Sequence, residues 1–351
     1  MSKIKSLEDI SWKVTEEEYR ADKALSYSTL AKYSRSGFNG LSSLFDKIET
    51  PSLTFGSAVD SIITGGFEEF NDRFLVLDYE VPSDTIIKMC QCLYENNKEL
   101  RSLEEGTNDE LSVVIDRFNY QPNWKPETRI KVFKEKGADY FNLLHLKEGK
   151  TLLDRNTYND VIKTVESLQN SRSTEWYFKP NNPFENVERL YQLKFKGTFN
   201  GVNYRCMADL IIVDYETKTI IPVDLKTSSK HEWDFFKSFM DWSYHIQARL
   251  YWNIIRQNLD NDPYFKDFNL LDYRFIVVNR YSLNPLVWDF HGTQSKNTLY
   301  YGNNNEYICK DPFEIGKELN EYLSRNHEVP LNIHKDSINN IDYWLNNYGC
   351  N

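Results

Sequence analysis

Apolar residues recur with a helical period through the first half of the chain. The segment ALSYSTLAKYSRSG (24–37) predicts a short helix, with Leu30 and Tyr33, three residues apart, on one face. The segment TPSLTFGSAVDSIITGG (50–66) predicts an extended entry followed by a helix that its glycine pair ends. From 67 to 180, apolar residues fall at i, i+3 and i+4, which predicts a helical insertion.

The period changes near residue 185. The segment ENVERLYQLKFKG alternates as a strand does, and Asn200-Gly201 between alternating segments predicts a tight hairpin. A third strand, ETKTIIPVDLKTSS, precedes a helical segment (231–259), which is one long helix or two in tandem, and then two more strands. This order favours an α/β domain with a mixed central sheet flanked by helices. The predicted domains are N-terminal helices (1–66), the helical insertion (67–180), a core of sheet and helix (181–294) and a C-terminal helical extension (295–351).

Composition narrows the function classes. The 351 residues include 42 Lys and Arg against 52 Asp and Glu, a net charge of −10. So acidic a chain is not a general coat for nucleic acid, because non-specific binding rests on Lys and Arg, although a local basic groove can still bind DNA. Five cysteines without a C-x-x-C pair argue against zinc or iron–sulfur sites and for free thiols in a reducing cytoplasm. No apolar run has the length of a membrane span, so we expect a soluble, cytoplasmic protein without a membrane partner.

The candidate chemistry lies in MADLIIVDYETKTIIPVDLKTSS (207–229). Asp209 begins the first apolar run, and Asp224 and Lys226 close the second, with fourteen residues between the two aspartates. A strand–turn–strand of this length can bring Asp209 alongside Asp224. Residues i and i+2 of a strand share a face, so Asp224 and Lys226 point the same way. Two carboxylates and one ammonium group are therefore predicted to converge.

Such a cluster is costly to bury unless it pairs or binds an ion. Mg²⁺ or Mn²⁺ suits it, because Mg²⁺ is commonly held by one or two carboxylates plus substrate phosphates. Asp209 and Asp224 can hold the metal, with the backbone carbonyl of Leu225 as a third ligand. Lys226 can orient or activate water and offset charge at the phosphate. The pattern is typical of a metal-dependent phosphodiesterase; the alternative is an ordinary surface hairpin with a salt bridge.

Four further segments sharpen this interpretation. Ser26, Ser28 and Leu30 stand in LSYSTLAKYSRS, and TPSLTFGSAVDSII contains a Phe-Gly-x-x-x-Asp helix. The first core strand is VERLYQLKFKG, and YHIQARLY carries Gln-x-x-x-Tyr after the lysine. With Asp…Asp-x-Lys, this set resembles the PD-(D/E)xK nuclease superfamily. The likeness is to its RecB-like branch and most of all to the RecE-type and lambda-type phage exonucleases, over somewhat more than a third of the chain.

That resemblance implies a PD-(D/E)xK core of αβββαβ order and a Mg²⁺-dependent deoxyribonuclease. An exonuclease acting on duplex ends in phage-type recombination is the favoured form, placed in the host cytoplasm if a phage encodes it. Asp209 and Asp224 would be metal ligands and Lys226 catalytic. Gln247 and Tyr251 would line the DNA-facing side, or else form a packing pair within a helix. Expected partners are DNA, a single-strand annealing protein and further copies of the chain, since the family includes rings.

Three positions leave alternatives open. Asp60 stands where the family has histidine; it can be a metal ligand, or the helix can have lost its catalytic part. Glu188 occupies the acidic position of the first core strand, as a metal ligand or as a solvated residue. Lys230, directly after the motif, is the expected phosphate contact.

Two other functions compete with the exonuclease. One is an endonuclease of the same fold. The other is a catalytically inactive DNA-binding or assembly protein on a nuclease fold, which Asp60 and the acidic net charge favour. The intact Asp-x-Lys argues against the inactive form.

Overall fold

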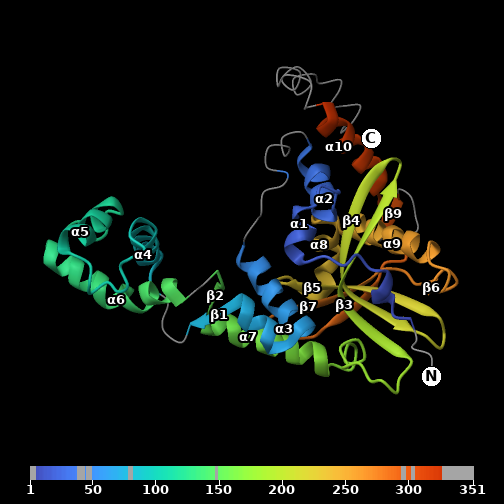
Figure 1. Ribbon diagram of the computed structural model, residues 1–351, viewed down its shortest axis with the longest axis horizontal. Coiled ribbons are helices and arrows are strands. Elements are labelled where there is room, and N and C mark those ends of the chain that lie inside the picture. Colours follow the sequence, from blue (N-terminus) through green and yellow to red (C-terminus); the bar gives the residue numbers. More distant parts are fainter. Residues whose placement is uncertain are drawn as a thin grey trace. The chain divides into compact units, whose positions relative to one another are not determined.

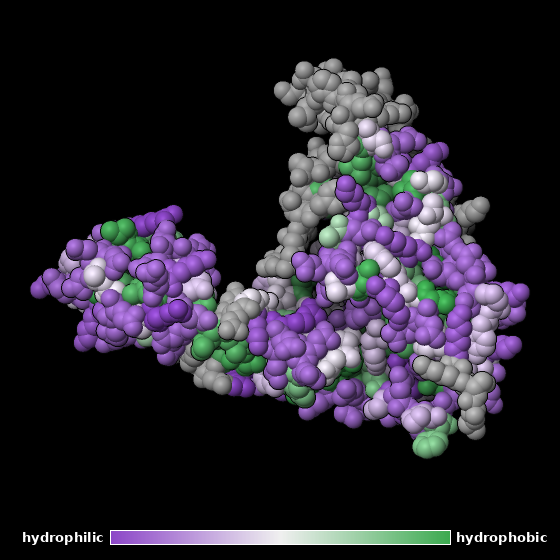
Figure 2. Space-filling view, in the orientation of Figure 1, coloured by the Kyte–Doolittle hydropathy of each residue, from purple (hydrophilic) through white to green (hydrophobic). Residues whose placement is uncertain are grey.

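The computed structural model describes residues 5–37, 44, 50–77, 82–146, 149–293, 298–301 and 305–325 (Figure 1). The chain forms two compact units, which are described separately below. The sheet unit comprises Met1–Ser52 and Glu166–Asn351, and the helical unit comprises Leu53–Val165. On the face shown in Figure 2, hydrophilic residues predominate, with apolar residues in smaller groups.

A mixed six-stranded sheet organises the sheet unit. The order is β3-β4-β5-β7-β8, with β6 also paired to β5. The first three strands are antiparallel, β5 and β7 run parallel, and β8 is antiparallel to β7. The predicted mixed α/β architecture is thus confirmed. The strands are β3 (Val187–Phe199), β4 (Val202–Asp214), β5 (Thr219–Ser228), β6 (Asn269–Leu270), β7 (Arg274–Asn279) and β8 (Leu286–Asp289).

The tight turn between β3 and β4 lies where the sequence predicts it. Asn200 and Gly201 have φ of 51° and 77°, and Phe199 pairs with Val202 across the turn. Two consecutive positive φ angles define the two-residue hairpin loop that Asn-Gly favours, because its twist matches the strands. This turn sets the register of the hairpin that carries Asp209.

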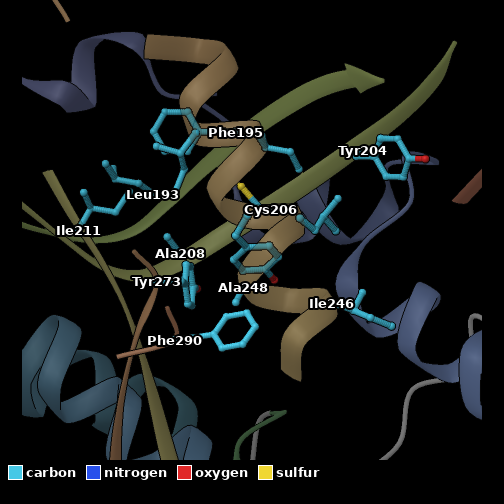
Figure 3. Packing of buried hydrophobic residues seen from close by; sticks show 14 of the residues in the cluster. Leu193, Phe195, Tyr204, Cys206, Ala208, Ile211, Ile246, Ala248, Tyr273 and Phe290 are labelled. Atoms are coloured by element: carbon cyan, nitrogen blue, oxygen red, sulfur yellow. The ribbon is translucent and has the colours of Figure 1, made fainter. Parts of the chain in front are cut away.

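Helices enclose the core of the sheet unit. Tyr204 and Cys206 of β4 and Ala248 of α9 lie in one buried cluster with the side chains of β3 (Figure 3). Ser243, with a left-handed φ of 57°, separates α8 from α9, so of the two forms predicted for 231–259 the structure has two helices in tandem. The helical elements are η1 (Leu7–Ile10), α1 (Glu16–Ala21), α2 (Tyr27–Ser36), η3 (Glu232–Asp234), α8 (Phe235–Asp241), α9 (Tyr244–Asp260) and α10 (Pro312–Arg325).

The C-terminal segment departs from the predicted helical extension. An antiparallel hairpin of β9 (Thr298–Tyr301) and β10 (Asn305–Ile308) precedes α10. Residues 298–301 pair with residues 305–308 before helical periodicity resumes. Residues 326–351 of the predicted extension lie outside the described residues.

Most elements of the helical unit are helices, as the i, i+3, i+4 spacing of apolar residues from 67 to 180 predicts. Its first helix begins directly at Pro51, without the predicted extended entry, because proline suits the first helical turn. Gly66, with φ of 70°, interrupts that helix but the chain resumes it. The short β1 and β2 pair in parallel, which the sequence does not indicate. Its elements, of which the first and the last extend past the bounds of the unit, are α3 (Pro51–Arg73), β1 (Phe74–Leu77), α4 (Asp84–Asn96), α5 (Asn108–Arg117), α6 (Pro126–Leu146), β2 (Thr151–Asp154) and α7 (Arg155–Asn170).

Within these residues, no helix combines the length and hydropathy needed to span a membrane.

Candidate active site

Asp209 and Asp224 meet where β4 and β5 stop pairing. The last ladder pair at that end is Leu210 with Val223, so the next residues along the two strands are the two aspartates. Asp209 Oδ2 instead accepts a hydrogen bond from the Leu225 backbone N–H at 3.0 Å. The Asp209 carboxylate thus replaces a backbone carbonyl of β4 as the acceptor for Leu225, and this hydrogen bond holds Asp209 beside Asp224.

A break in β3 faces Asp209. The β3–β4 register is continuous on both sides, but Gln192 and Asp209 are left out of it. Gln192 has φ of 52°, which is unusual for a residue inside a strand. On β4, Cys206 and Ala208 before the break and Ile211 and Val213 after it belong to the same buried cluster. The face that meets this cluster therefore switches at Asp209, although the register of the two strands stays the same.

Asp224 is fully buried and has two close partners. Gln247 Nε2 of α9 donates to its Oδ1 at 2.5 Å, and Lys226 Nζ lies 2.6 Å from its Oδ2. Asp224 and Lys226 are two apart on β5 and share the face that α9 covers. An ionised carboxylate without exposure is costly unless it is paired, and here an ammonium group and an amide provide the pairing.

Lys226 stays charged in this environment. Its Nζ lies 4.7 Å from the centroid of the Tyr244 ring, a cation–π distance, and its side chain is 18 % exposed. Burial alone lowers the pKa of Lys226, but the Asp224 carboxylate, followed by Tyr244 and Asp209, outweighs it, so that the pKa is raised. The site thus holds a protonated ammonium group beside two carboxylates.

The donor set suits a small, hard cation. Asp224 Oδ2 and Gln247 Oε1 are buried oxygens without a hydrogen-bond donor; Lys226 approaches the first closely, but not in hydrogen-bond geometry. In the part of the chain described, no group of three or more His, Cys, Asp and Glu is placed to hold a metal. Mg²⁺ is commonly bound by one or two carboxylates and keeps several waters, so Asp209 and Asp224 fit it.

Leu225 can add a backbone oxygen. The N–H and C=O of one strand residue point to the same neighbour, and the Leu225 N–H points towards β4. The pairing with β4 ends two residues earlier, at Val223. The carbonyl predicted as a ligand is therefore on the edge where Asp209 lies.

Glu188 lies away from this cluster. It pairs opposite Val213, four residues along β4 from Asp209, which is about 13 Å at the rise of a strand. Its carboxylate accepts hydrogen bonds from the Ser6 hydroxyl at 2.9 and 3.0 Å and from the Tyr215 hydroxyl. Glu188 is half-buried, and its role as a metal ligand or as a solvated strand residue stays a prediction.

The predicted DNA-facing residues differ in their surroundings. Gln247 and Tyr251 are 5 % and 7 % exposed, so neither lines an open surface. Gln247 bonds to Asp224, and the Tyr251 ring lies 6.2 Å from that of Tyr273, so this helical face is turned to the core. Lys230 is exposed, and its Nζ donates to Asp241 at 3.0 Å; its role as a phosphate contact stays a prediction.

Asp60 belongs to the helical unit. It lies half-buried on α3, and its backbone carbonyl accepts a hydrogen bond from the Thr64 hydroxyl at 2.9 Å. Asp209 and Asp224 lie in the sheet unit. The metal-ligand role of Asp60 therefore stays a prediction.

Sequence reasoning missed two residues of the site. Tyr244, beneath Lys226, lies three residues before Gln247 on α9, a spacing that places both on one helical face and so was available as a signal. Gln192 offered no signal, because glutamine is not a residue that marks positive φ.

Comparisons with known proteins add little. No family model matches the chain, and no curated protein matches it. Among solved structures, one described as "Putative exonuclease" from Eubacterium rectale is similar over 91 % of this chain and 89 % of that chain, at 13 % identity and a TM-score of 0.41. A likeness at this TM-score does not assign a function to this chain.

Proposed function

We propose that this protein is a Mg²⁺- or Mn²⁺-dependent DNA nuclease that hydrolyses phosphodiester bonds at the Asp209–Asp224–Lys226 cluster. One observation carries the proposal. A fully buried aspartate at the end of strand pairing is held by an ammonium group and an amide, beside a second carboxylate. Stability alone gives no reason for such a group, since buried ion pairs are often matched by apolar residues. Clustered, perturbed titratable groups are typical of catalytic sites.

The residues present fit a divalent cation. The carboxylates of Asp209 and Asp224 and the carbonyl of Leu225 would hold it. When bound, the cation would polarise a phosphoryl oxygen and lower the pKa of a coordinated water.

The chain's own residues do the remaining work. Gln247 fixes the orientation of the Asp224 carboxylate through its 2.5 Å hydrogen bond. The Lys226 ammonium, held over the Tyr244 ring, can donate to the attacking water and offset charge on the phosphate. Asp209 keeps its position through the Leu225 N–H, so both carboxylates are pre-organised by neighbours other than substrate.

The finer assignments rest on the motif resemblance. It supports a PD-(D/E)xK core, an exonuclease acting on duplex ends, a role in phage-type recombination and a single-strand annealing partner. The mixed sheet with two strands parallel at the site is compatible with such a core.

The test uses linear and covalently closed circular duplex DNA, each with Mg²⁺, with Mn²⁺ and with chelator. Metal-dependent loss of the linear form alone is the expected result for an end-dependent exonuclease. Cutting of the circle identifies an endonuclease. Cleavage that persists in chelator contradicts the metal-dependent site.

Two observations favour a second candidate, a DNA-binding or assembly protein without catalysis. No group of three or more His, Cys, Asp and Glu among the described residues is placed to hold a metal. Aspartate also stands at position 60, where the family has histidine. This candidate predicts DNA binding without cleavage under every metal condition.

A further inference from the structure

Two loops leave the sheet beside the candidate active site. β5 and β7 are parallel neighbours, with Ser228 paired to Asn279 at their carboxyl ends. Lys226 lies two residues before the end of β5, so the segments that follow, 229–234 and 280–285, emerge at the same edge as the site. Carboxyl ends of parallel strands are where ligands commonly bind in α/β sheets.

Buried polar contacts join these loops into one surface. The Glu232 carboxylate, 5 % exposed, accepts a hydrogen bond from the Asn279 backbone N–H at 3.2 Å and another from the Ser282 hydroxyl. The Asn279 side chain, 1 % exposed, donates to the Lys230 carbonyl at 2.8 Å. Both loops are therefore fixed relative to β5 and β7.

Aromatic side chains project from this fixed base into solvent. Trp233 is 73 % exposed and stacks on His231, with ring centroids 4.2 Å apart and planes 8° from parallel. Tyr281 on the other loop is 65 % exposed, and the Arg280 guanidinium lies 4.6 Å from its ring centroid. We call His231, Trp233 and Tyr281 the aromatic platform. Exposed apolar groups that gather in one patch commonly mark an interaction site.

The charged side chains around the platform leave little uncompensated negative charge that would repel a nucleic-acid backbone. Two acidic neighbours each lie near a lysine: the half-buried Asp234 is 3.8 Å from Lys237, and the exposed Asp241 is 3.0 Å from Lys230. Arg280 adds a cation next to Tyr281. Stacking surfaces flanked by cations are the combination with which proteins bind single-stranded nucleic acid without sequence preference.

We propose that the aromatic platform binds bases of a single-stranded nucleic-acid segment next to the active site. This deepens the proposed function, on which it rests for the identity of the substrate. Stacking suits such a role because every base has a π face, and a duplex does not expose those faces. The platform would thus hold unpaired bases of the strand whose backbone reaches Lys226.

The experiment measures binding apart from cleavage. The full-length Asp224→Asn protein is titrated against fluorescein-labelled oligo(dT), a strand of equal length made of abasic spacers, and a duplex, by anisotropy in chelator. Trp233→Ala and Tyr281→Ala are compared with Trp233→Phe, which keeps a stacking ring. Phe184→Ala is the matched control, because Phe184 is 95 % exposed and lies in the loop before β3.

Trp233→Ala is expected to bind oligo(dT) about tenfold more weakly, the size of one lost base–aromatic stack. Trp233→Phe and Phe184→Ala should bind as the parent does, and the abasic strand should bind weakly to all. The proposal is overturned if the parent binds oligo(dT) and the abasic strand with equal affinity. It is also overturned if neither Trp233→Ala nor Tyr281→Ala binds oligo(dT) more weakly than the parent. Conversion of an oligomer into a monomer by Trp233→Ala, seen by light scattering, overturns it as well, because the surface would then be a contact between copies.

Failure of the proposed function is distinguishable from failure of the platform. If the wild-type protein cleaves nothing while Trp233→Ala shows the expected loss of oligo(dT) binding, the nuclease is refuted and the platform stands. A protein that cleaves but binds both strands equally refutes the platform alone.

Discussion

The Asp209 carboxylate accepts the Leu225 backbone N–H at 3.0 Å, at the point where β4 and β5 stop pairing. This contact does two things. It satisfies a strand N–H that has lost its ladder partner, and it places a negative charge next to the buried Asp224. The two roles can be separated by substitution.

Asp209→Asn keeps an oxygen that can accept the Leu225 N–H but removes the charge, whereas Asp209→Ala removes both. We expect the asparagine variant to keep an unfolding free energy close to that of the wild type and to lose activity. The alanine variant should lose activity and about 1–3 kcal/mol of unfolding free energy, the cost of a buried donor without an acceptor. Urea denaturation and a cleavage assay check this. An active asparagine variant would show that the charge is not needed.

Gln192 is expected to position Asp209 through its backbone. At φ of 52°, asparagine is tolerated but a β-branched residue is not. Gln192→Val should therefore destabilise the sheet unit by about 1–3 kcal/mol and weaken Mg²⁺ binding. Gln192→Asn should do neither. Calorimetric titration with Mg²⁺ separates the two effects, and equal Mg²⁺ affinity in both variants would refute the positioning role.

Gln247 should control the Asp224 carboxylate. Gln247→Leu removes the donor to Asp224 Oδ1, a hydrogen bond to a charged group worth about 1.5–3 kcal/mol, so we expect at least a tenfold loss of activity. Gln257→Leu is the matched control on the same helix, because Gln257 bonds to the Thr198 backbone instead. Similar loss in both variants would mean that α9 is merely destabilised.

His245 should make stability depend on pH. Burial, followed by the neighbouring Arg249, lowers the pKa of His245 to about 3. The unfolded chain, with a histidine pKa of about 6.5, then binds more protons between these values. Unfolding free energy should therefore fall as the pH drops from 6.5, by up to about 1.4 kcal/mol per pH unit from this residue. Denaturation of wild type and His245→Leu from pH 7 to 4 checks this; equal slopes would contradict it.

Turn residues and strand periodicity predicted which strands carry the candidate site. Asn200-Gly201 specifies its turn chemically, and the spacing of Asp209 and Asp224 matches the register that this hairpin and the next produce. Asp224 and Lys226 share a face because strands alternate. These features depend on residues close in the chain, which is why the sequence contained them.

Other features depend on contacts that periodicity does not encode. The i, i+4 spacing puts Gln247 and Tyr251 on one helical face, but only packing decides that the face meets the core. The pairing of β1 with β2 joins four-residue strands more than seventy residues apart. The strain at Gln192 follows from the sheet around it, since the residue itself has no preference for that conformation.

Release of label from an end-labelled linear duplex in Mg²⁺, compared between wild type and Asp224→Asn, measures whether the Asp209–Asp224–Lys226 cluster cleaves DNA. Circular dichroism and thermal melts establish that both proteins are folded. The account predicts release by wild type that chelator stops and that the folded variant lacks. A folded Asp224→Asn protein that releases label at the wild-type rate would contradict it.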